Sequence, residues 1–250
     1  MQQHRLVDQQ FGQVAQAYLT SVVHAQGADL DALAALAQSV PHAKVLDLGC
    51  GGGHVSFAMA PHAATVVAYD LSEDMLAVVA AEASRRGLTD LHTRAGRAEA
   101  LPFDDATFDI VASRFSVHHW YDARKGLAEA RRVLKPGGRL VIVDVFAPEV
   151  PLLDTFLQAA EVLRDASHVR NYRLSEWQAM LAEAGFQPAS PRTWKLPMAF
   201  EGWIARIRTP QVRADAIRHL FDHAAEEARG YFAVTPDHSF AIDAMMIEAI

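Results

Sequence analysis

Short apolar runs alternate with stretches of helical spacing through the middle of the chain. The apolar runs predict strands at 44–48, 65–70, 91–95, 108–115 and 139–146. Between them, the recurrence of apolar residues predicts helices at about 53–60, within 71–87 and at 122–134. Ser72 is expected to cap the second helix, Gly87 to end it, and the KPGG run to end the third. This alternation predicts an α/β fold with a doubly wound, mostly parallel sheet.

The pattern changes on both sides of this core. Residues 5–38 keep helical spacing. Beyond Pro148 the spacing predicts helices at 151–166, 175–185 (capped by Ser175), 201–207 and 210–229. Two further strands are expected, at 187–196 and in the last apolar segment, FAIDAMMIEAI. We therefore expect one domain over 1–250, with helices at 1–38, an α/β core at 40–147 and added helices with the last strands at 148–250.

Composition narrows the class of protein. The chain has 250 residues, of which 51% are hydrophobic and 21% charged, so a sizeable core is available. A net charge of -7 argues against a nucleic-acid partner. Cys50 is the only cysteine, and neither a signal core nor an apolar run of membrane-spanning length is present. We expect a cytoplasmic protein without a membrane span, and the sequence indicates no oligomeric state.

Two of the predicted strands each carry an aspartate near their carboxyl end, beside a glycine-rich turn. Asp47 precedes the turn, and Asp70 ends the next strand. Closely spaced glycines let a ligand approach the backbone, and an acid at the end of the second strand suits the hydroxyls of a ribose. Asp47 is placed to attract an ammonium group. The glycines expected to face the ligand are Gly49, Gly51 and Gly53.

The same turn bears on which nucleoside is bound. The dinucleotide fingerprint G-x-G-x-x-G needs a third glycine where this chain has His54. The turn therefore favours a nucleoside without a pyrophosphate, and S-adenosylmethionine is the preferred ligand. An NAD(P)-dependent oxidoreductase and a non-catalytic nucleoside-binding module are the alternatives.

Five segments together resemble a known family. They are VLDLGCGGG, VVAYDLSEDML, GRAEALPF, FDIVASRFSVHHW and RVLKPGGRLVIVD. Their order and spacing over about 40–147 resemble class I S-adenosylmethionine-dependent methyltransferases, most closely the ubiquinone/menaquinone biosynthesis branch. The resemblance implies a Rossmann-like sheet of seven strands, the last antiparallel, and methyl transfer to a small-molecule acceptor. It makes 40–147 the cofactor-binding core and places the substrate beside 148–250.

The resemblance also implies particular contacts with the cofactor. Asp47 and the glycines would hold the methionine part and Asp70 the ribose. The adenosine would lie near Leu71 and Met75, with Ala98 and Glu99 at the adenine edge. Many relatives carry an aspartate where this chain has Arg97, and arginine cannot accept a hydrogen bond from the adenine amino group. Adenine recognition is then expected from the backbone at 97–98 or from shape.

The remaining candidates concern catalysis and the acceptor. The run RFSVHHW follows the fourth strand, so Arg114 is expected at the cofactor and His118 or His119 as a general base, the alternative being histidines that only pack. In the N-terminal helices Tyr18 is a candidate cover for the cofactor, with Phe11 and His24 shaping the pocket, or all three are core residues. In ASHVRNYRLSEW, the candidate substrate contacts are His168, Arg170 and Tyr172, or the segment is a polar loop.

No metal site is expected. His219 and His223 are four residues apart, but Leu220 stands where a metalloprotease motif needs glutamate, so a helix without metal is favoured.

Overall fold

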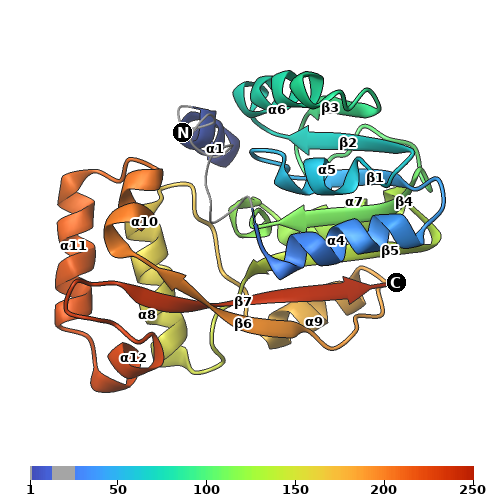
Figure 1. The fold of residues 1–250 in the computed structure, drawn as a ribbon. Helices are drawn as coiled ribbons and strands as arrows, with labels where there is room; N and C mark the ends of the chain where they lie inside the picture. The colour runs from blue at the N-terminus through green and yellow to red at the C-terminus, as the bar shows by residue number, and fades with distance from the viewer. Residues whose placement is uncertain (1, 13–25) are drawn as a thin grey trace.

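A single sheet organises the molecule. The computed structural model describes residues 2–12 and 26–250, and within them seven strands pair in the order β3-β2-β1-β4-β5-β7-β6 (Figure 1). The strands are β1 (Lys44–Leu48), β2 (Thr65–Asp70), β3 (Leu91–Ala95), β4 (Phe108–Arg114), β5 (Leu134–Val145), β6 (Arg192–Met198) and β7 (Phe240–Ala249). The pairs among β1 to β5 are parallel, whereas β7 is antiparallel to both β5 and β6. The predicted doubly wound sheet of seven strands, with an antiparallel last strand, is confirmed.

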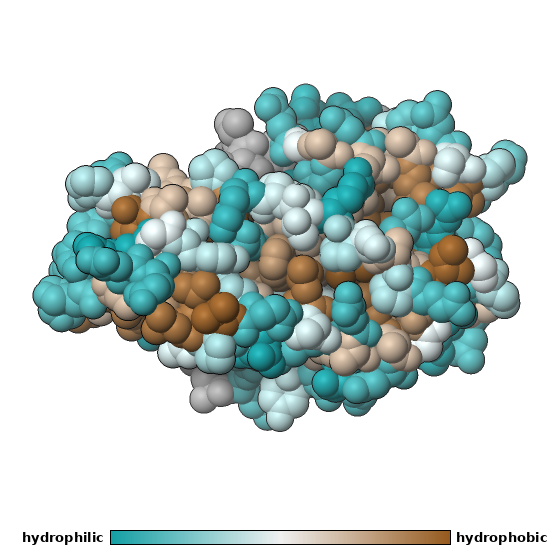
Figure 2. Space-filling model, turned by 90° about the horizontal axis from the view of Figure 1, so that it is seen from below, coloured by the Kyte–Doolittle hydropathy of each residue, from teal (hydrophilic) through white to brown (hydrophobic). Residues whose placement is uncertain are grey.

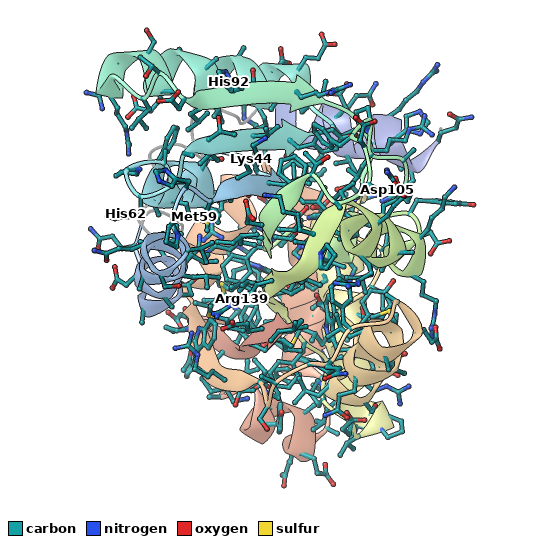
Figure 3. The ribbon with its side chains drawn as sticks, turned by 90° about the vertical axis from the view of Figure 1, so that its right-hand side faces the viewer. Lys44, Met59, His62, His92, Asp105 and Arg139 are labelled. Atoms are coloured by element: carbon teal, nitrogen blue, oxygen red, sulfur yellow. The ribbon has the colours of Figure 1, made fainter. Side chains whose placement is uncertain are left out.

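The strand order reverses at β1, which pairs with β2 on one side and with β4 on the other. The connections on the two sides of β1 therefore run to opposite edges of the sheet. In open α/β sheets a ligand binds outside the carboxyl ends of the strands at such a reversal. Figure 3 shows the opposite edge of the sheet, where Lys44 begins β1.

Helices cover both faces of the sheet because its central strands are apolar on both sides. Side chains alternate along β1, so Val45 belongs to one buried cluster and Leu46 to the other. The first cluster includes residues of α4 (Ala28–Ser39), α5 (His54–Met59) and α6 (Glu73–Arg86). The second includes residues of α7 (Ala123–Val133) and α9 (Leu174–Glu183). The sheet is thus the middle of three layers, as the sequence predicts.

The remaining helices gather beyond the carboxyl ends of the parallel strands (Figure 1). They are α8 (Pro151–Arg164), α10 (Phe200–Arg206), α11 (Gln211–Asp222) and α12 (Glu226–Tyr231). A third cluster joins them to Val145 at the end of β5 and to Met198 and Ile242 of the β6–β7 hairpin. At the other end of the chain, α1 (Gln3–Gly12) packs near α6.

Several predicted boundaries are wrong, and the reasons are local. Ser72 does stand at the N-cap of α6 as predicted, although its side chain makes no capping bond and its N–H donates to the Asp70 carboxylate. Ser175 lies inside α9, and Arg173 stands at the N-cap instead. The Ser175 hydroxyl donates a hydrogen bond to the Glu149 carboxylate. The helix predicted at 210–229 is divided into α11 and α12, and β6 begins at Arg192 rather than at 187.

The surface carries apolar as well as polar side chains. On the face seen in Figure 2, brown apolar residues gather on the side of the helices that follow β5. Exposed large apolar side chains of this part include Val150, Leu152 and Val162. Among the residues that the structure describes, none of the helices has the length and apolar character needed to cross a membrane.

Candidate functional site

A cavity of about 810 Å³ opens where the sheet reverses. It is lined by residues that end four parallel strands: Leu48 of β1, Asp70 of β2, Arg114 of β4 and Val145 of β5. Its volume lies within the range of about 300–1,000 Å³ usual for small-ligand sites. One part faces the glycine turn after β1, and the other extends toward α8, α10 and the β6–β7 hairpin.

The glycine turn is held across the sheet and presents its backbone to the cavity. The N–H groups of Gly49 and Cys50 both donate to the carbonyl of Tyr69, at 2.8 and 3.0 Å. Gly51 has a φ of 48°, and a Cβ there would meet open space, whereas one on Gly49 would overlap the side chain of Ser116. Gly49 and Gly51 therefore both line the cavity as predicted, and Gly51 leaves room for a ligand against its backbone.

Gly53 differs from Gly49 and Gly51 in its position. It does not line the cavity formed by the described residues. It takes the left-handed conformation, with a φ of 79°, at the N-cap of α5. A Cβ would come within 2.9 Å of Val79 and 3.0 Å of Phe57. The positive φ and the lack of room for a Cβ explain the glycine at position 53 by the turn and its packing.

Asp47 is a buried acid at the cavity wall. Its Oδ2 accepts hydrogen bonds from the N–H of Ser56 at 2.9 Å and from the Ser56 hydroxyl at 2.6 Å. Burial raises the pKa of Asp47 to about 7, although both hydrogen bonds act to lower it. The two forms of the acid are therefore nearly balanced at neutral pH, and a cationic group in the cavity would favour the carboxylate.

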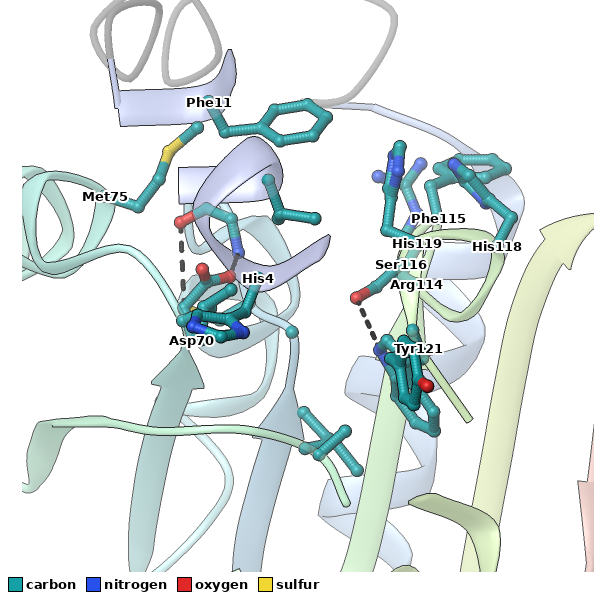
Figure 4. Close-up of a pocket in the computed structure, with 18 of the residues that line it drawn as sticks. His4, Phe11, Asp70, Met75, Arg114, Phe115, Ser116, His118, His119 and Tyr121 are labelled. Carbon is teal, nitrogen blue, oxygen red and sulfur yellow. Dashed lines mark hydrogen bonds between the residues drawn. The ribbon is translucent and has the colours of Figure 1, made fainter. Parts of the chain in front are cut away.

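Asp70 closes the turn from the next strand (Figure 4). Its Oδ2 accepts from the N–H of Gly51 at 2.8 Å and its Oδ1 from that of Ser72 at 2.9 Å. Burial raises the pKa of Asp70 in spite of these bonds. A carboxylate has about four lone-pair sites, so each oxygen can still accept a hydrogen bond from a ligand hydroxyl.

The residues predicted beside an adenosine come together on one wall. Leu71, Met75, Ala98 and Glu99 all line the cavity. The Glu99 carboxylate also accepts from the N–H of Asp122 at 3.2 Å, which fixes the loop that follows β4.

Arg97 lies at the same wall and faces the N-terminal helix. Its carbonyl accepts from the Tyr69 hydroxyl at 3.1 Å, and its guanidinium lies 3.1 Å from His4 Nε2. His4, Val7 and Phe11 of α1 line the cavity. The predicted pocket role of Phe11 therefore agrees with its position, whereas Tyr18 and His24 lie outside the described residues.

Arg114 lines the cavity, and its guanidinium also forms a buried ion pair. Its Nε donates to the carboxylate of Asp29 at 2.5 Å, and both side chains are buried. This ion pair joins the end of β4 to the first turn of α4. The contact with Asp29 gives Arg114 a positioning role at the site.

His118 differs from the other histidines of the site in its charged neighbour. Its Nδ1 lies 2.6 Å from Oδ1 of Asp144, a buried residue of β5 whose Oδ1 also accepts from the N–H of Val145. Burial acts to lower the pKa of His118, but the Asp144 carboxylate outweighs it, so the pKa is raised. Because Nδ1 donates to Asp144, Nε2 is the proton-accepting nitrogen. In the described part of the chain, no hydrogen bond occupies this nitrogen.

His119 and His168 lie against His118 and are held neutral. The ring centroid of His118 is 4.2 Å from that of His119 and 5.8 Å from that of His168. Burial, and then the charge of His118, lower the pKa of His119 to about 4 and that of His168 to about 2. Of the two predicted catalytic histidines, His118 is therefore the one suited to take up a proton near neutral pH.

The predicted substrate contacts His168, Arg170 and Tyr172 are absent from the lining formed by the described residues. His168 bonds to Gln158 at 3.0 Å and packs behind His118. The Arg170 guanidinium bridges two carboxylates, and Tyr172 packs edge-on against Trp177. These side chains therefore contact their own segment and its neighbours, and their predicted contact with a substrate stays a prediction.

From the same segment it is Asn171 that lines the cavity. Its side chain is buried, and its Nδ2 has no hydrogen-bond partner among the described residues.

Sequence reasoning missed the far part of the cavity. The residues lining it come from segments that are distant in the sequence: Val145, Glu161, Arg164, Leu196, Met198, Trp203, Arg206 and Ile242. Their shared position follows from the packing of the β6–β7 hairpin against α8 and α10. In the sequence, only the helical spacing of 151–166 places Glu161 and Arg164 on one face.

The structure adds no metal-binding group to this site. Among the described residues, no cluster of three or more His, Cys, Asp or Glu side chains is arranged to hold an ion. His219 and His223 lie together, but the Nδ1 of His223 pairs with the carbonyl of His219.

A mostly parallel seven-stranded sheet of this order, with helices on both faces, defines the Rossmann-like fold of methyltransferases. A family model described as "Methyltransferase domain" matches residues 46–142. The "Uncharacterized methyltransferase YcgJ" of Bacillus subtilis is 37% identical over 96% of this chain and 97% of its own length. The chain belongs to the methyltransferase family.

Other similarities extend over different shares of the chain. The crystal structure of YcgJ has a TM-score of 0.85 at 37% identity and covers 88% of this chain and 97% of that one. A putative methyltransferase from Bacillus halodurans also reaches 0.85 at 35% identity, covering 89% and 98%. The demethylmenaquinone methyltransferase of Clavibacter sepedonicus is 46% identical, but over only 44% of each chain. These matches favour a methyltransferase over the oxidoreductase alternative.

Proposed function

We propose that this protein is an S-adenosylmethionine-dependent methyltransferase that acts on a small-molecule acceptor, with His118 as the general base. The observation that carries the proposal is the contact between His118 and Asp144 beside a cavity formed by Asp70 and the glycine turn. The family of the chain supports methyl transfer. Asp47, Asp70 and Met75 line the same cavity, and this supports the choice of donor.

The residues of this part of the cavity fit the donor. Asp47 is nearly balanced between its two forms and suits the ammonium group, and Asp70 keeps lone pairs for the two ribose hydroxyls. The open space at Gly51 accommodates a ligand against the backbone, while Leu71 and Met75 provide apolar contact for the adenine. When bound, S-adenosylmethionine supplies an electrophilic methyl group on a sulfonium sulfur.

The protein's own part in the chemistry is to position the acceptor and to take its proton. The Asp144 carboxylate holds the imidazole of His118 in one orientation and stabilises its protonated form. His119 and His168 stay neutral and pack around it. The base form of His118 grows as the pH rises through its raised pKa, so turnover of an acceptor that must lose a proton increases over that range.

Calorimetry and a methyl-transfer assay test the two halves of the proposal. We expect Asp70→Asn to weaken binding of S-adenosylmethionine by about tenfold or more, because it removes a charged hydrogen-bond acceptor. Asp74→Asn is the matched control, since Asp74 is exposed on α6. Absence of micromolar binding to the wild type would refute the choice of donor.

Radiolabelled methyl transfer to a metabolite extract then tests catalysis. His118→Gln should retain binding of the donor and lose most of the transfer, whereas His92→Gln, at an exposed position on β3, should behave as wild type. Binding without transfer to any acceptor would instead support the non-catalytic nucleoside-binding module. Equal turnover of His118→Gln and wild type would exclude the histidine as the base.

A further inference from the structure

The far part of the cavity is an apolar chamber that contains one buried ion pair. Its apolar walls come from β5, β6, α10 and β7, and the residues are Val145, Leu196, Met198, Trp203 and Ile242. Glu161 and Arg164 reach this chamber from the last turns of α8. Apolar walls with a few fixed polar groups are typical of small-molecule sites, in which the polar groups decide orientation.

The guanidinium of Arg164 is fixed in place, and most of its donors are unused. Its Nε donates to the carbonyl of Trp203 at 3.1 Å, and the group lies over the Trp203 ring at 4.9 Å. Its Nη1 is 3.7 Å from Glu161 Oε2, which is too long for a hydrogen bond. The side chain is only 11% exposed. Two N–H₂ groups therefore lack an acceptor among the described residues, in the planar arrangement that matches a carboxylate.

Glu161 does not satisfy this arginine. It makes no hydrogen bond with any described residue, and burial raises its pKa although Arg164 acts to lower it. The charged groups that act on it from the surrounding elements are Arg164, His118, Asp165 and Asp144. Arg206 also lines the chamber, one helical turn beyond Trp203. When Glu161 is protonated, Arg164 has no carboxylate partner within hydrogen-bonding distance among the described residues.

We infer that Arg164 is the docking point for a carboxylate of the methyl acceptor, so that the acceptor is a small monocarboxylate with an apolar body. The inference rests on the proposed function, because it assigns the acceptor half of the same cavity. The carboxylate forms a paired hydrogen bond with the guanidinium, and the body of the acceptor lies along Leu196, Met198 and Ile242. This binding orients the acceptor with one end at Arg164 and leaves its reacting group toward His118.

Matched probes distinguish a carboxylate site from a purely apolar chamber. Hydrocinnamate and hydrocinnamyl alcohol share one apolar body and differ in charge, and each is titrated calorimetrically into the full chain with S-adenosylhomocysteine present. We expect the acid to bind about tenfold or more tightly than the alcohol. Its affinity should fall as the pH rises, because ionised Glu161 opposes a second carboxylate.

Three variants locate the effect. Arg164→Met should reduce the affinity for the acid to that for the alcohol and leave the alcohol unchanged. Glu161→Gln should bind the acid more tightly and flatten the pH dependence. Arg218→Met is the matched control, because Arg218 also stacks on an aromatic ring, that of Phe200, but pairs with Glu201 outside the chamber.

The outcomes separate this inference from the proposed function. Equal binding of acid and alcohol by the wild type, or unchanged binding of the acid by Arg164→Met with an unchanged melting temperature, would overturn the carboxylate site. If Arg164→Met melts early, weaker binding of the acid by Glu161→Gln would overturn it independently. Failure of S-adenosylhomocysteine to bind, with the preference for the acid intact, would overturn the proposed donor and support the carboxylate site.

Discussion

Replacing Asp144 by asparagine keeps the shape of the side chain and removes its charge. In the wild type the buried carboxylate accepts from His118 Nδ1 at 2.6 Å and from the N–H of Val145 at 2.8 Å. A hydrogen bond to a charged group contributes about 1.5–3 kcal/mol to stability. We therefore expect Asp144→Asn to lower the free energy of unfolding by about that amount. For a chain of this size this corresponds to a fall in Tm of roughly 3–12 °C.

The variant should also change how stability depends on pH. The pKa of His118 is raised above its unfolded value near 6.5, so its contribution is fully present below that pH and is lost as the pH rises through the folded pKa. Without the Asp144 charge, burial alone acts on the imidazole and lowers its pKa. The contribution of His118 then changes sign, and stability is lost as the pH falls.

Thermal and denaturant unfolding measure both effects. The measurements cover about pH 5 to 9, because histidine titrates within this range. A double-mutant cycle with Asp144→Asn, His118→Gln and the double variant isolates the coupling between the two residues. We expect a coupling free energy above about 1 kcal/mol at pH 6. Additive single effects, or an unchanged pH slope in Asp144→Asn, would refute the assignment of the raised pKa to this pair.

Other predictions concern the glycine turn after β1, Asp47, and Arg170 in the segment between α8 and α9. Gly53→Ala should destabilise the fold by about 1–3 kcal/mol in denaturant unfolding, since a Cβ would contact Phe57 and Val79 at a φ of 79°. Gly51→Ala should act mainly on the affinity for S-adenosylhomocysteine, because a Cβ would enter the open cavity; equal loss of stability in the two variants would contradict this difference. Affinity for S-adenosylhomocysteine should rise with pH through about 7, the pKa of Asp47, and calorimetry should find a flat profile in Asp47→Asn. Arg170→Met should lower the Tm while leaving binding of hydrocinnamate unchanged, because Arg170 bridges Asp154 and Glu176 outside the cavity.

The clustering of the residues proposed to bind the donor could be predicted because these residues are close in sequence. Asp47 and the glycines lie in one turn, and Asp70 ends the next strand, so parallel pairing of β1 and β2 alone brings them together. The position of Gly53 outside the cavity lining that the described residues form could not be predicted, because both a ligand turn and a tightly packed turn select glycine. A Cβ at position 53 would come too close to Val79, which lies on α6 and is distant in the sequence.

The acceptor half could not be predicted in the same way. Arg170 carries charge in a loop after β5, which suggested a substrate contact, but Asp154 and Glu176 neutralise it in the fold. Glu161 and Arg164 look like an ordinary exposed i,i+3 pair on a helix. Their burial follows from the docking of α10, which supplies the Trp203 ring and carbonyl under the guanidinium.

The end of β5 divides the chain between the residues proposed to bind the donor and those proposed to bind the acceptor. The residues proposed to bind the donor all precede the end of β5. The residues that line the proposed acceptor chamber lie almost wholly after it. The demethylmenaquinone methyltransferase of Clavibacter sepedonicus matches only 44% of the chain, which is less than these two parts together. Val145 ends β5 where the two parts meet, directly after Asp144. We therefore expect an exchange of the segment after β5 between relatives to change the acceptor while the proposed donor residues and Asp144 are retained.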